Sequence, residues 1–285
     1  MGFSLLSGDQ QRSVSLLLEP RDAVAFSSVN RELRASTQAQ RQQLRADHEV
    51  AAALSRKAAG MRSCKELREA KRAVWNNTGL SAADLATLGT LGSVLPALAE
   101  LHLVQFAGTV GPDGVQRLAE GLGAGALPAM TLLAIRGVHV GDAGASALAA
   151  ALGRGAMPRL KFLNLCNTAL TDAGLVALAP ALRQRPALEQ LCLTGNPLGD
   201  EGLAALVAPP PPAGVPPPPT AGLAKLKKLN LSWTQVTDAG CAALAAALDS
   251  GALPAAALEK LYLDDIRASD AAVAAVGRAG LEVMY

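Results

Sequence analysis

The sequence predicts an α/β solenoid in which short parallel strands line a concave face and helices cover the outside, behind a small all-helical N-terminal region. Two observations support this prediction: a spacing of apolar residues that returns six times, and a motif typical of helix starts between the copies. The composition agrees with it. Half of the 285 residues are hydrophobic but only 3% are aromatic, so many small and similar units must share the core.

The frame L-x-x-L-x-L indicates the strand of each unit. Its six copies begin at residues 98, 130, 160, 188, 226 and 258, so successive starts differ by 32, 30, 28, 38 and 32 residues. Met130 and Ile135 replace leucine in the second copy. Because successive residues of a strand point to opposite faces, we expect the leucines to be buried and the residues between them to be exposed.

A second motif predicts a helix after each strand. The sequences GDAG, TDAG, GDEG and TDAG, at 141–144, 171–174, 199–202 and 237–240, each precede an apolar run. A Thr or Asp side chain caps the free backbone N–H groups of a helix start, and the carboxylate favours the positive end of the helix dipole. Leucines then recur four residues apart, which puts them on one helical face. Gly-Ala-(Leu/Met)-Pro at 125–128, 155–158 and 251–254 ends the helix.

A proline-rich insert, PPPPAGVPPPPTAG, occupies residues 209–222 and accounts for the one spacing of 38 residues. Its P-x-x-P pattern favours polyproline II, the conformation that SH3, WW and profilin-type domains bind. Solenoids also tolerate insertions in their loops. We therefore favour an inert loop expansion and keep binding by such domains as the alternative.

The strand frame with its following D-x-G helix closely resembles the ribonuclease-inhibitor-like class of leucine-rich repeats. The resemblance covers residues 80–285, including an earlier half-unit at 80–98 and a final LEVMY that predicts the start of one more strand. Asn196 matches the polar position of the family, and Thr168 and Thr234 replace it elsewhere. Val138 and Ile266 depart from it, which predicts an incomplete polar ladder in the turns.

In the front end, residues 1–36, Leu18 is followed four residues later by Asp22 and then by Val29 and Arg31. This spacing resembles an F-box, the short helical motif that docks on the Skp adaptor of cullin-RING ubiquitin ligases. Ser7 stands where the motif has proline, and Ala23 where it has leucine. The alternative is a small helical cap that seals the solenoid. The resemblance implies adaptor contacts for Leu6, Val14, Leu18, Asp22, Val29 and Arg31.

Residues 37–79 are expected to form a helical bridge or N-terminal cap between the front motif and the repeats. A polar, helix-prone stretch covers 37–60, and the pattern Ser63-Cys64-Lys65-Glu66 is a capping box. We expect it to open a charged helix that continues through Trp75 and stops at the Asn76-Asn77-Thr78-Gly79 turn.

The exposed strand positions form a mixed wall of polar, charged and aromatic side chains. Aromatic residues and Arg dominate the energetics of protein interfaces, so this wall suits a protein client. Trp233 follows one strand directly and is expected at the rim. The candidate binding residues on this concave face are His102, Arg136, Phe162, Asn164, Lys228, Asn230 and Tyr262, with Trp233.

Other classes of function find little support. The three histidines have no ligand partners at metal spacing, and we expect no metal, no cofactor and no catalytic residues. A net charge of +2 with few aromatics argues against nucleic-acid binding. No apolar run is long enough for a membrane span, and no signal peptide is recognised, so a cytoplasmic or nuclear location is expected. Cys166 and Cys192 fall on neighbouring strands out of register, and two free thiols are expected there.

Two classes of function therefore remain. The F-box-like resemblance implies the substrate-recognition subunit of an SCF-type, cullin-RING ubiquitin ligase. The alternative is a scaffold or regulator without a ligase link, for example in small-GTPase regulation, because the GTPase-activating protein for Ran has similar repeats.

Overall fold

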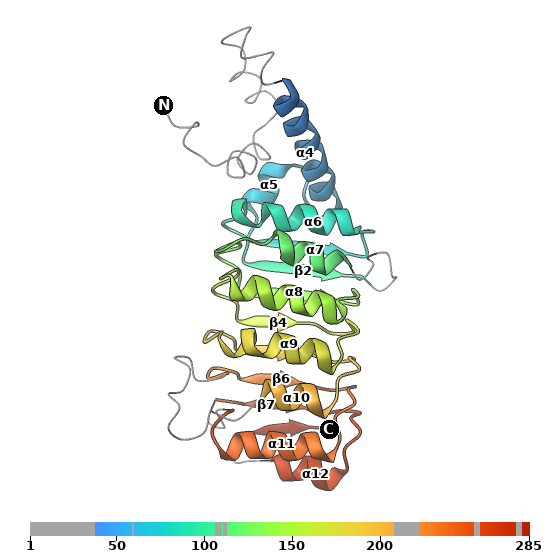
Figure 1. Ribbon diagram of the computed structural model, residues 1–285, viewed down its shortest axis with the longest axis vertical. Helices are drawn as coiled ribbons and strands as arrows, with labels where there is room; N and C mark the ends of the chain where they lie inside the picture. The colour runs from blue at the N-terminus through green and yellow to red at the C-terminus, as the bar shows by residue number, and fades with distance from the viewer. Residues whose placement is uncertain are drawn as a thin grey trace.

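The structure is a computed structural model that describes residues 38–58, 60–105, 110, 113–207, 223–253, 257–277 and 281–285. These residues form one elongated stack of strand–helix units (Figure 1). The F-box-like segment at 1–36 and the proline-rich insert at 209–222 lie outside the described residues.

Within the described residues, eight parallel strands form one sheet in which each strand pairs with its neighbours in chain order. The register aligns the central leucine of each frame, so that Leu133, Leu163 and Leu191 are direct neighbours across three strands. This sheet confirms the predicted solenoid, and the predicted strand at the end of the sequence is its last member. The strands are β1 (Arg72–Asn76), β2 (Glu100–Val104), β3 (Leu132–Arg136), β4 (Phe162–Asn164), β5 (Gln190–Cys192), β6 (Lys228–Asn230), β7 (Lys260–Tyr262) and β8 (Glu282–Met284).

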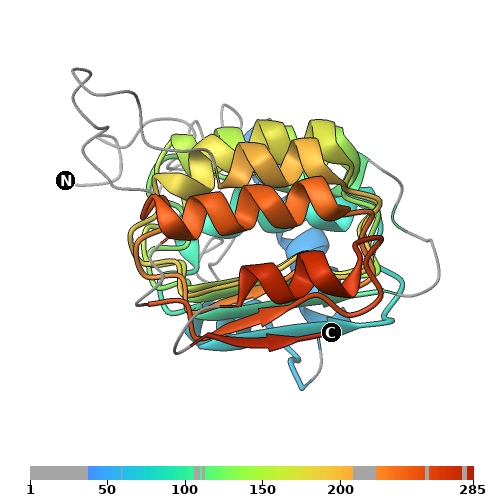
Figure 2. The same ribbon diagram turned by 90° about the horizontal axis from the view of Figure 1, so that it is seen from below.

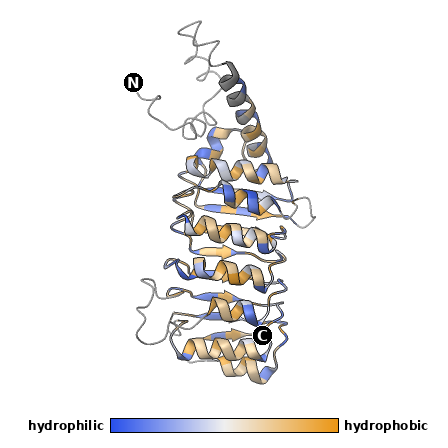
Figure 3. Ribbon diagram, viewed as in Figure 1, coloured by the Kyte–Doolittle hydropathy of each residue, from blue (hydrophilic) through white to orange (hydrophobic). Residues whose placement is uncertain are grey.

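The helices form a second layer that covers one face of the sheet (Figure 2). Consecutive helices from α6 to α12 pack against one another. The helices α8, α9 and α11 are apolar along most of their length, as their Ala- and Leu-rich sequences require (Figure 3). They are α6 (Ala82–Leu91), α7 (Asp113–Gly121), α8 (Gly141–Gly153), α9 (Asp172–Arg183), α10 (Asp200–Leu206), α11 (Asp238–Asp249) and α12 (Asp270–Val276), with a short 3₁₀ helix, η2 (Gly92–Val94), after α6.

One continuous apolar core lies between the two layers. Leu163 and Leu229 from the strands are fully buried, and so are Leu178 and Leu244 from the helices. A single unit has one strand and one helix, which cannot enclose these side chains alone. Stability therefore depends on contacts between neighbouring units.

The Asp residue of each D-x-G motif caps the helix of the next unit, which the sequence alone does not reveal. Asp142 at the start of α8 accepts hydrogen bonds from the backbone N–H groups of Thr171 and Gly174, both at 3.0 Å, at the start of α9. Its other oxygen accepts the Thr171 hydroxyl at 2.7 Å. The same hydrogen bonds to the next helix start recur in three further units. Asp172 accepts them from the start of α10, Asp200 from the start of α11, and Asp238 from Ser269 before α12.

This capping explains why the third residue of the motif is glycine. A Cβ atom on Gly174 would overlap Asp142 Oδ1, and one on Gly240 would overlap Asp200 Oδ1. A side chain at this position would therefore displace the carboxylate that links two units.

At the other end of the helices, arginines reach back to the preceding unit. Arg154, just after α8, donates to the carbonyl oxygens of Ala119 and Leu122 at 2.9 and 3.0 Å, where α7 ends. Arg185 donates to Leu152 O in the same way after α9. A cation at this place satisfies free carbonyl groups and suits the negative end of the helix dipole.

Asn196 holds two neighbouring turns together from a buried position. Its Oδ1 atom accepts from the backbone N–H groups of Thr168 and Leu170, each at 3.0 Å, and its Nδ2 donates to Leu165 O and Leu193 O, each at 2.7 Å. Thr234 donates its hydroxyl within its own unit, to Leu231 O at 2.6 Å. The polar ladder is thus incomplete, as the sequence predicted.

The front of the solenoid differs from the prediction. Helix α4 (Gln38–Lys57) is present as expected, but α5 (Cys64–Glu69) ends early. The expected continuation of this helix through Trp75 is wrong, because residues 72–76 form β1, the first strand of the sheet. Ala73 and Trp75 are fully buried at the places that leucines occupy in the next strand.

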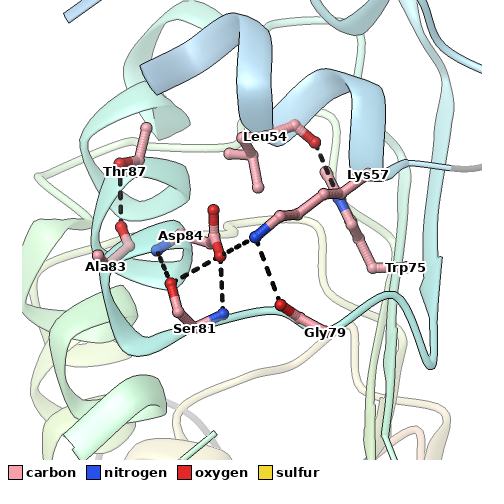
Figure 4. A network of polar contacts seen from close by, with 8 residues as sticks. All are labelled: Leu54, Lys57, Trp75, Gly79, Ser81, Ala83, Asp84 and Thr87. Carbon is pink, nitrogen blue, oxygen red and sulfur yellow. Dashed lines mark hydrogen bonds and ion pairs between the residues drawn. The ribbon is translucent and has the colours of Figure 1, made fainter. Parts of the chain in front are cut away.

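Helix α4 is fastened to the first unit by polar contacts of Trp75 and Lys57, and Lys57 Nζ also donates to Gly79 O at 3.3 Å (Figure 4). Trp75 Nε1 donates to the backbone carbonyl of Leu54 at 3.2 Å, and Lys57 Nζ lies 2.6 Å from Asp84 Oδ2. Asp84 also completes a capping box with Ser81 at the start of α6. Burial by itself would raise the pKa of Asp84, but the hydrogen bonds from Lys57 and Ser81 outweigh it and the pKa is lowered.

Candidate protein-binding surface

The strand face presents three rows of side chains that run across the sheet. In the first and second rows the side chains stand on either side of the central residue of each strand, which is leucine in β2 to β7, Ala73 in β1 and Val283 in β8. The first row contains Arg72, Glu100, Leu132, Phe162, Gln190, Lys228, Lys260 and Glu282, and the second contains Val74, His102, Ala134, Asn164, Cys192, Asn230, Tyr262 and Met284. The third row lies two residues beyond the second, at the end of a strand or just after it, and contains Asn76, Val104, Arg136, Cys166, Thr194, Ser232 and Asp264.

The structure places all eight predicted surface residues on this face or in the turn beside it. Phe162 and Lys228 lie in the first row, and Arg136 lies in the third. Trp233 lies in the turn after β6. The second row holds His102, Asn164, Asn230 and Tyr262. Their role in binding remains a prediction.

The asparagines of the second row are held in place by neighbouring groups. Asn164 Oδ1 accepts from the backbone N–H of Cys166 at 3.0 Å. Asn230 Oδ1 accepts from the N–H of Ser232 at 2.9 Å and from the hydroxyl of Thr194 at 2.8 Å. These side chains are therefore ordered before any partner arrives, which lowers the entropy cost of binding.

Ion pairs neutralise the two ends of the first row. Arg72 lies 3.3 Å from Glu100, and Lys260 lies 2.8 Å from Glu282. Between these pairs the row is apolar or neutral at Leu132, Phe162 and Gln190. Within the described part of the chain, Arg136 and Lys228 have no ion-pair partner. The middle of the face thus combines apolar surface with two unneutralised cations.

Trp233 occupies a backbone conformation that does not suit it. The fourth residue after the central residue of the strand has a positive φ in six units, and the others are Asn77, Gly137, Asn167, Gly195 and Asp265. Gly, Asn and Asp tolerate this left-handed region, whereas a bulky side chain is strained there by about 1–2 kcal/mol. Trp233 adopts φ 60° and leaves 62% of its surface exposed. Trp233 is not part of the hydrophobic core, so its strained backbone and its exposure make it a candidate binding residue.

Cys166 and Cys192 lie closer than the sequence indicated. They are out of register as expected, because Cys192 pairs with Asn164, yet their Sγ atoms lie 2.8 Å apart along a diagonal between β4 and β5. The hydrogen bond from Cys166 is the main cause that lowers the pKa of Cys192 to about 6, against burial, with help from Thr194 and the charge of Arg136. The pKa of Cys166 is raised by the same hydrogen bond and by burial. The sequence did contain a signal for this contact: Cys166 follows Asn164, the register partner of Cys192, by two residues and so lies on the same face of the sheet.

Some predictions cannot be placed on the structure. The adaptor positions Leu6, Val14, Leu18, Asp22, Val29 and Arg31 lie outside the described residues, as does the insert at 209–222. Over the described ranges, no three His, Cys, Asp or Glu side chains gather as a metal ion would require. None of the helices described is both long and apolar enough to cross a bilayer.

Comparison with known proteins finds a family match in two segments of the chain. Residues 186–207 and 222–245 match the leucine-rich repeat family, which covers the units of β5 and β6 on both sides of the proline-rich insert. The fold and these matches together define a leucine-rich-repeat solenoid. Repeats of this family characteristically serve protein–protein interaction.

Two further comparisons add little beyond the fold. No curated protein matches the chain. A solved structure that it resembles is an internalin from Listeria monocytogenes, with 15% sequence identity and a TM-score of 0.37. The similarity covers 68% of this chain and 49% of the internalin chain, so the matched region spans about half the length of that protein.

Proposed function

We propose that the strand face binds a protein client and that residues 1–36 dock a Skp-type adaptor, so that the chain acts as the substrate-recognition subunit of an SCF-type, cullin-RING ubiquitin ligase. The observation that carries the first half is Trp233, an exposed aromatic side chain held in a strained turn beside the strand face. The second half depends on the F-box-like spacing of residues 1–36.

The middle of the face has the composition of a protein interface. Trp233, Phe162 and Tyr262 supply aromatic surface, and such residues anchor binding when a partner buries them. Asn164 and Asn230 supply ordered polar groups between them. Arg136 and Lys228 favour a client segment that carries carboxylates.

The connection between the front segment and the solenoid supports a receptor role. Residues 1–36 precede α4, and α4 is fastened to the first unit through Trp75 and Asp84. Because residues 1–36 precede α4 in the chain, an adaptor bound to them would be linked to a client on the strand face through α4 and the repeats. We also infer that the repeats are of the ribonuclease-inhibitor-like class, because an α-helix follows the strand in units of 28–32 residues.

A pull-down with purified Skp adaptor tests the ligase half of the proposal. The intact chain should capture the adaptor at micromolar concentration. The double variant Leu18→Asp/Val29→Asp should lose capture with an unchanged melting temperature, because buried charges then oppose the adaptor interface. The matched control is Val50→Asp on α4, whose side chain is exposed and lies outside the motif. It should leave capture intact.

Two results would contradict the ligase role. Failure of the intact chain to bind the adaptor would leave a scaffold or a regulator of another kind, such as one acting on a small GTPase. A lower melting temperature in the double variant would instead indicate that residues 1–36 form a cap on the solenoid.

A further inference from the structure

Two thiols meet at the centre of the strand face. Cys192 lies in the second row between Asn164 and Asn230, and Cys166 lies in the third row beside Arg136. Their sulfur atoms are 2.8 Å apart, so they need to approach by less than an ångström to reach the bond length of about 2.05 Å in a disulfide. The other cysteines of the chain, Cys64 in α5 and Cys241 in α11, are buried in the core.

The neighbours of this pair favour a reactive thiolate on Cys192. Thr194 Oγ1 lies 3.2 Å from Cys192 Sγ, and the Cys166 thiol can donate to the same sulfur. Arg136 adds a positive charge that has no ion-pair partner among the described residues. Cys192 is half-buried, whereas Cys166 is only 7% exposed, so a small oxidant has freer access to Cys192. Reactive cysteines have these surroundings, and structural ones do not.

We propose that Cys166 and Cys192 form a thiol-oxidation site, at which a hydroperoxide converts the pair into a disulfide between β4 and β5. The Cys192 thiolate attacks the peroxide, which forms an S–O bond, breaks the O–O bond and releases hydroxide that leaves as water. The sulfur of Cys166 then attacks the Cys192 sulfenic acid, forms the S–S bond and releases the second water with the thiol proton. Two thiols lose two electrons, and one hydrogen peroxide becomes two waters.

Oxidation would change the surface on which a client sits, and this consequence rests on the proposed function of the strand face. The disulfide removes the thiolate that Arg136 faces and ties the side chains of two strands together. Phe162 and Asn164 flank the pair on β4, within the first and second rows. Client binding is therefore expected to differ between the reduced and the oxidised chain, and an added dithiol should restore it.

Mass spectrometry of the intact chain tests the site without any client. Arg183 lies between the two cysteines, so a tryptic digest places them on different peptides. After treatment with equimolar hydrogen peroxide, the non-reduced digest should contain these peptides linked to each other, while Cys64 and Cys241 stay as thiols. Oxidation of Cys192 to sulfinic acid with no link to Cys166, or equal oxidation of all four cysteines, would overturn the proposal.

A trivalent arsenical gives a second test that needs no oxidant. Phenylarsine oxide bridges two adjacent thiols and releases water, so one molecule should bind per chain and resist a monothiol but not a dithiol. Cys166→Ala and Cys192→Ala should each abolish this binding, whereas Cys64→Ala and Cys241→Ala should retain it, with folding checked by circular dichroism. Retention in all four variants would contradict the pairing. Because neither test involves a client, failure of the site and failure of the proposed binding face are distinguishable.

Discussion

The units that begin at residues 160 and 226 have almost the same sequence framework but different surfaces. Both contain the strand Leu-Asn-Leu, a Thr in the turn and a Thr-Asp-Ala-Gly helix start. Both helices are capped by an Asp from the preceding unit, α9 by Asp142 and α11 by Asp200. The differences are concentrated on the strand face and its turn, where Phe162, Cys166 and Asn167 correspond to Lys228, Ser232 and Trp233. Shared positions thus build the solenoid, and differing positions are available for binding.

The largest expected effect concerns a shared position. Leu163→Ala and Leu229→Ala should each lower the free energy of unfolding by about 2–5 kcal/mol, because each opens a cavity in a fully buried layer. Chemical denaturation followed by circular dichroism measures both. The losses should be similar, since the two leucines occupy equivalent places in the register. A negligible loss for either variant would mean that its unit packs differently from its neighbours.

The glycine of the helix start should show the next largest effect. Gly174→Ala and Gly240→Ala should each cost about 1–3 kcal/mol, because the new Cβ overlaps the Asp carboxylate from the preceding unit. The matched controls are Ala173→Gly and Ala239→Gly, which introduce no such overlap. In a double-mutant cycle, Asp142→Ala should reduce the cost of Gly174→Ala, because the carboxylate oxygen that lies closest to the new Cβ is gone. Additive effects would show that the capping contact does not explain the glycine.

A reciprocal exchange at the positive-φ turn should give smaller and opposite effects. Trp233→Asn should stabilise the chain by about 1 kcal/mol, whereas Asn167→Trp should destabilise it by a similar amount, because Asn tolerates the left-handed region and Trp does not. Thermal unfolding measures both variants. A loss of stability in Trp233→Asn would show that the tryptophan serves the fold, and the argument for a binding role would fail.

The smallest expected effect concerns the insert between these two units. Deleting residues 209–220 should change the free energy of unfolding by less than about 0.6 kcal/mol, because the cost of closing a loop depends weakly on its length. The pairing of β5 with β6 keeps the register of the other strands across the insert. Circular dichroism should show unchanged helix and strand content. A large loss of either would contradict the interpretation of the insert as a loop expansion.

The repeat frame allowed the fold to be predicted because burial imposes the same residue types in each unit. It failed at β1, where Ala73 and Trp75 fill the places of leucines. The spacing could have revealed this strand. Ala73 lies 28 residues before Leu101, and Leu163 lies the same 28 residues before Leu191. The charged, helix-like sequence that precedes Ala73 led instead to the prediction of a helix through Trp75.

Contacts between units were less predictable than the units themselves. Asp142 was expected at a helix start, but only the stacking of the units shows that it caps the following helix. The thiol pair was missed for the same reason, because a diagonal contact depends on how side chains lean between two strands. The strain at Trp233 becomes visible once its backbone is compared with Asn167 and Gly195. Aligning the units in sequence would have shown an aromatic residue where five other units have Asn, Gly or Asp.

Comparative affinity capture tests the claim that the strand face around Trp233 binds protein. The intact chain, Trp233→Asn and Val176→Asn should be used as baits, with captured proteins quantified by mass spectrometry. Val176 is the matched control because it is 39% exposed on α9, in the helix layer rather than on the strand face. The account predicts proteins that the intact chain and Val176→Asn retain and that Trp233→Asn loses at least tenfold, with capture of the Skp adaptor equal for all three baits. Identical client capture by the intact chain and Trp233→Asn would contradict it.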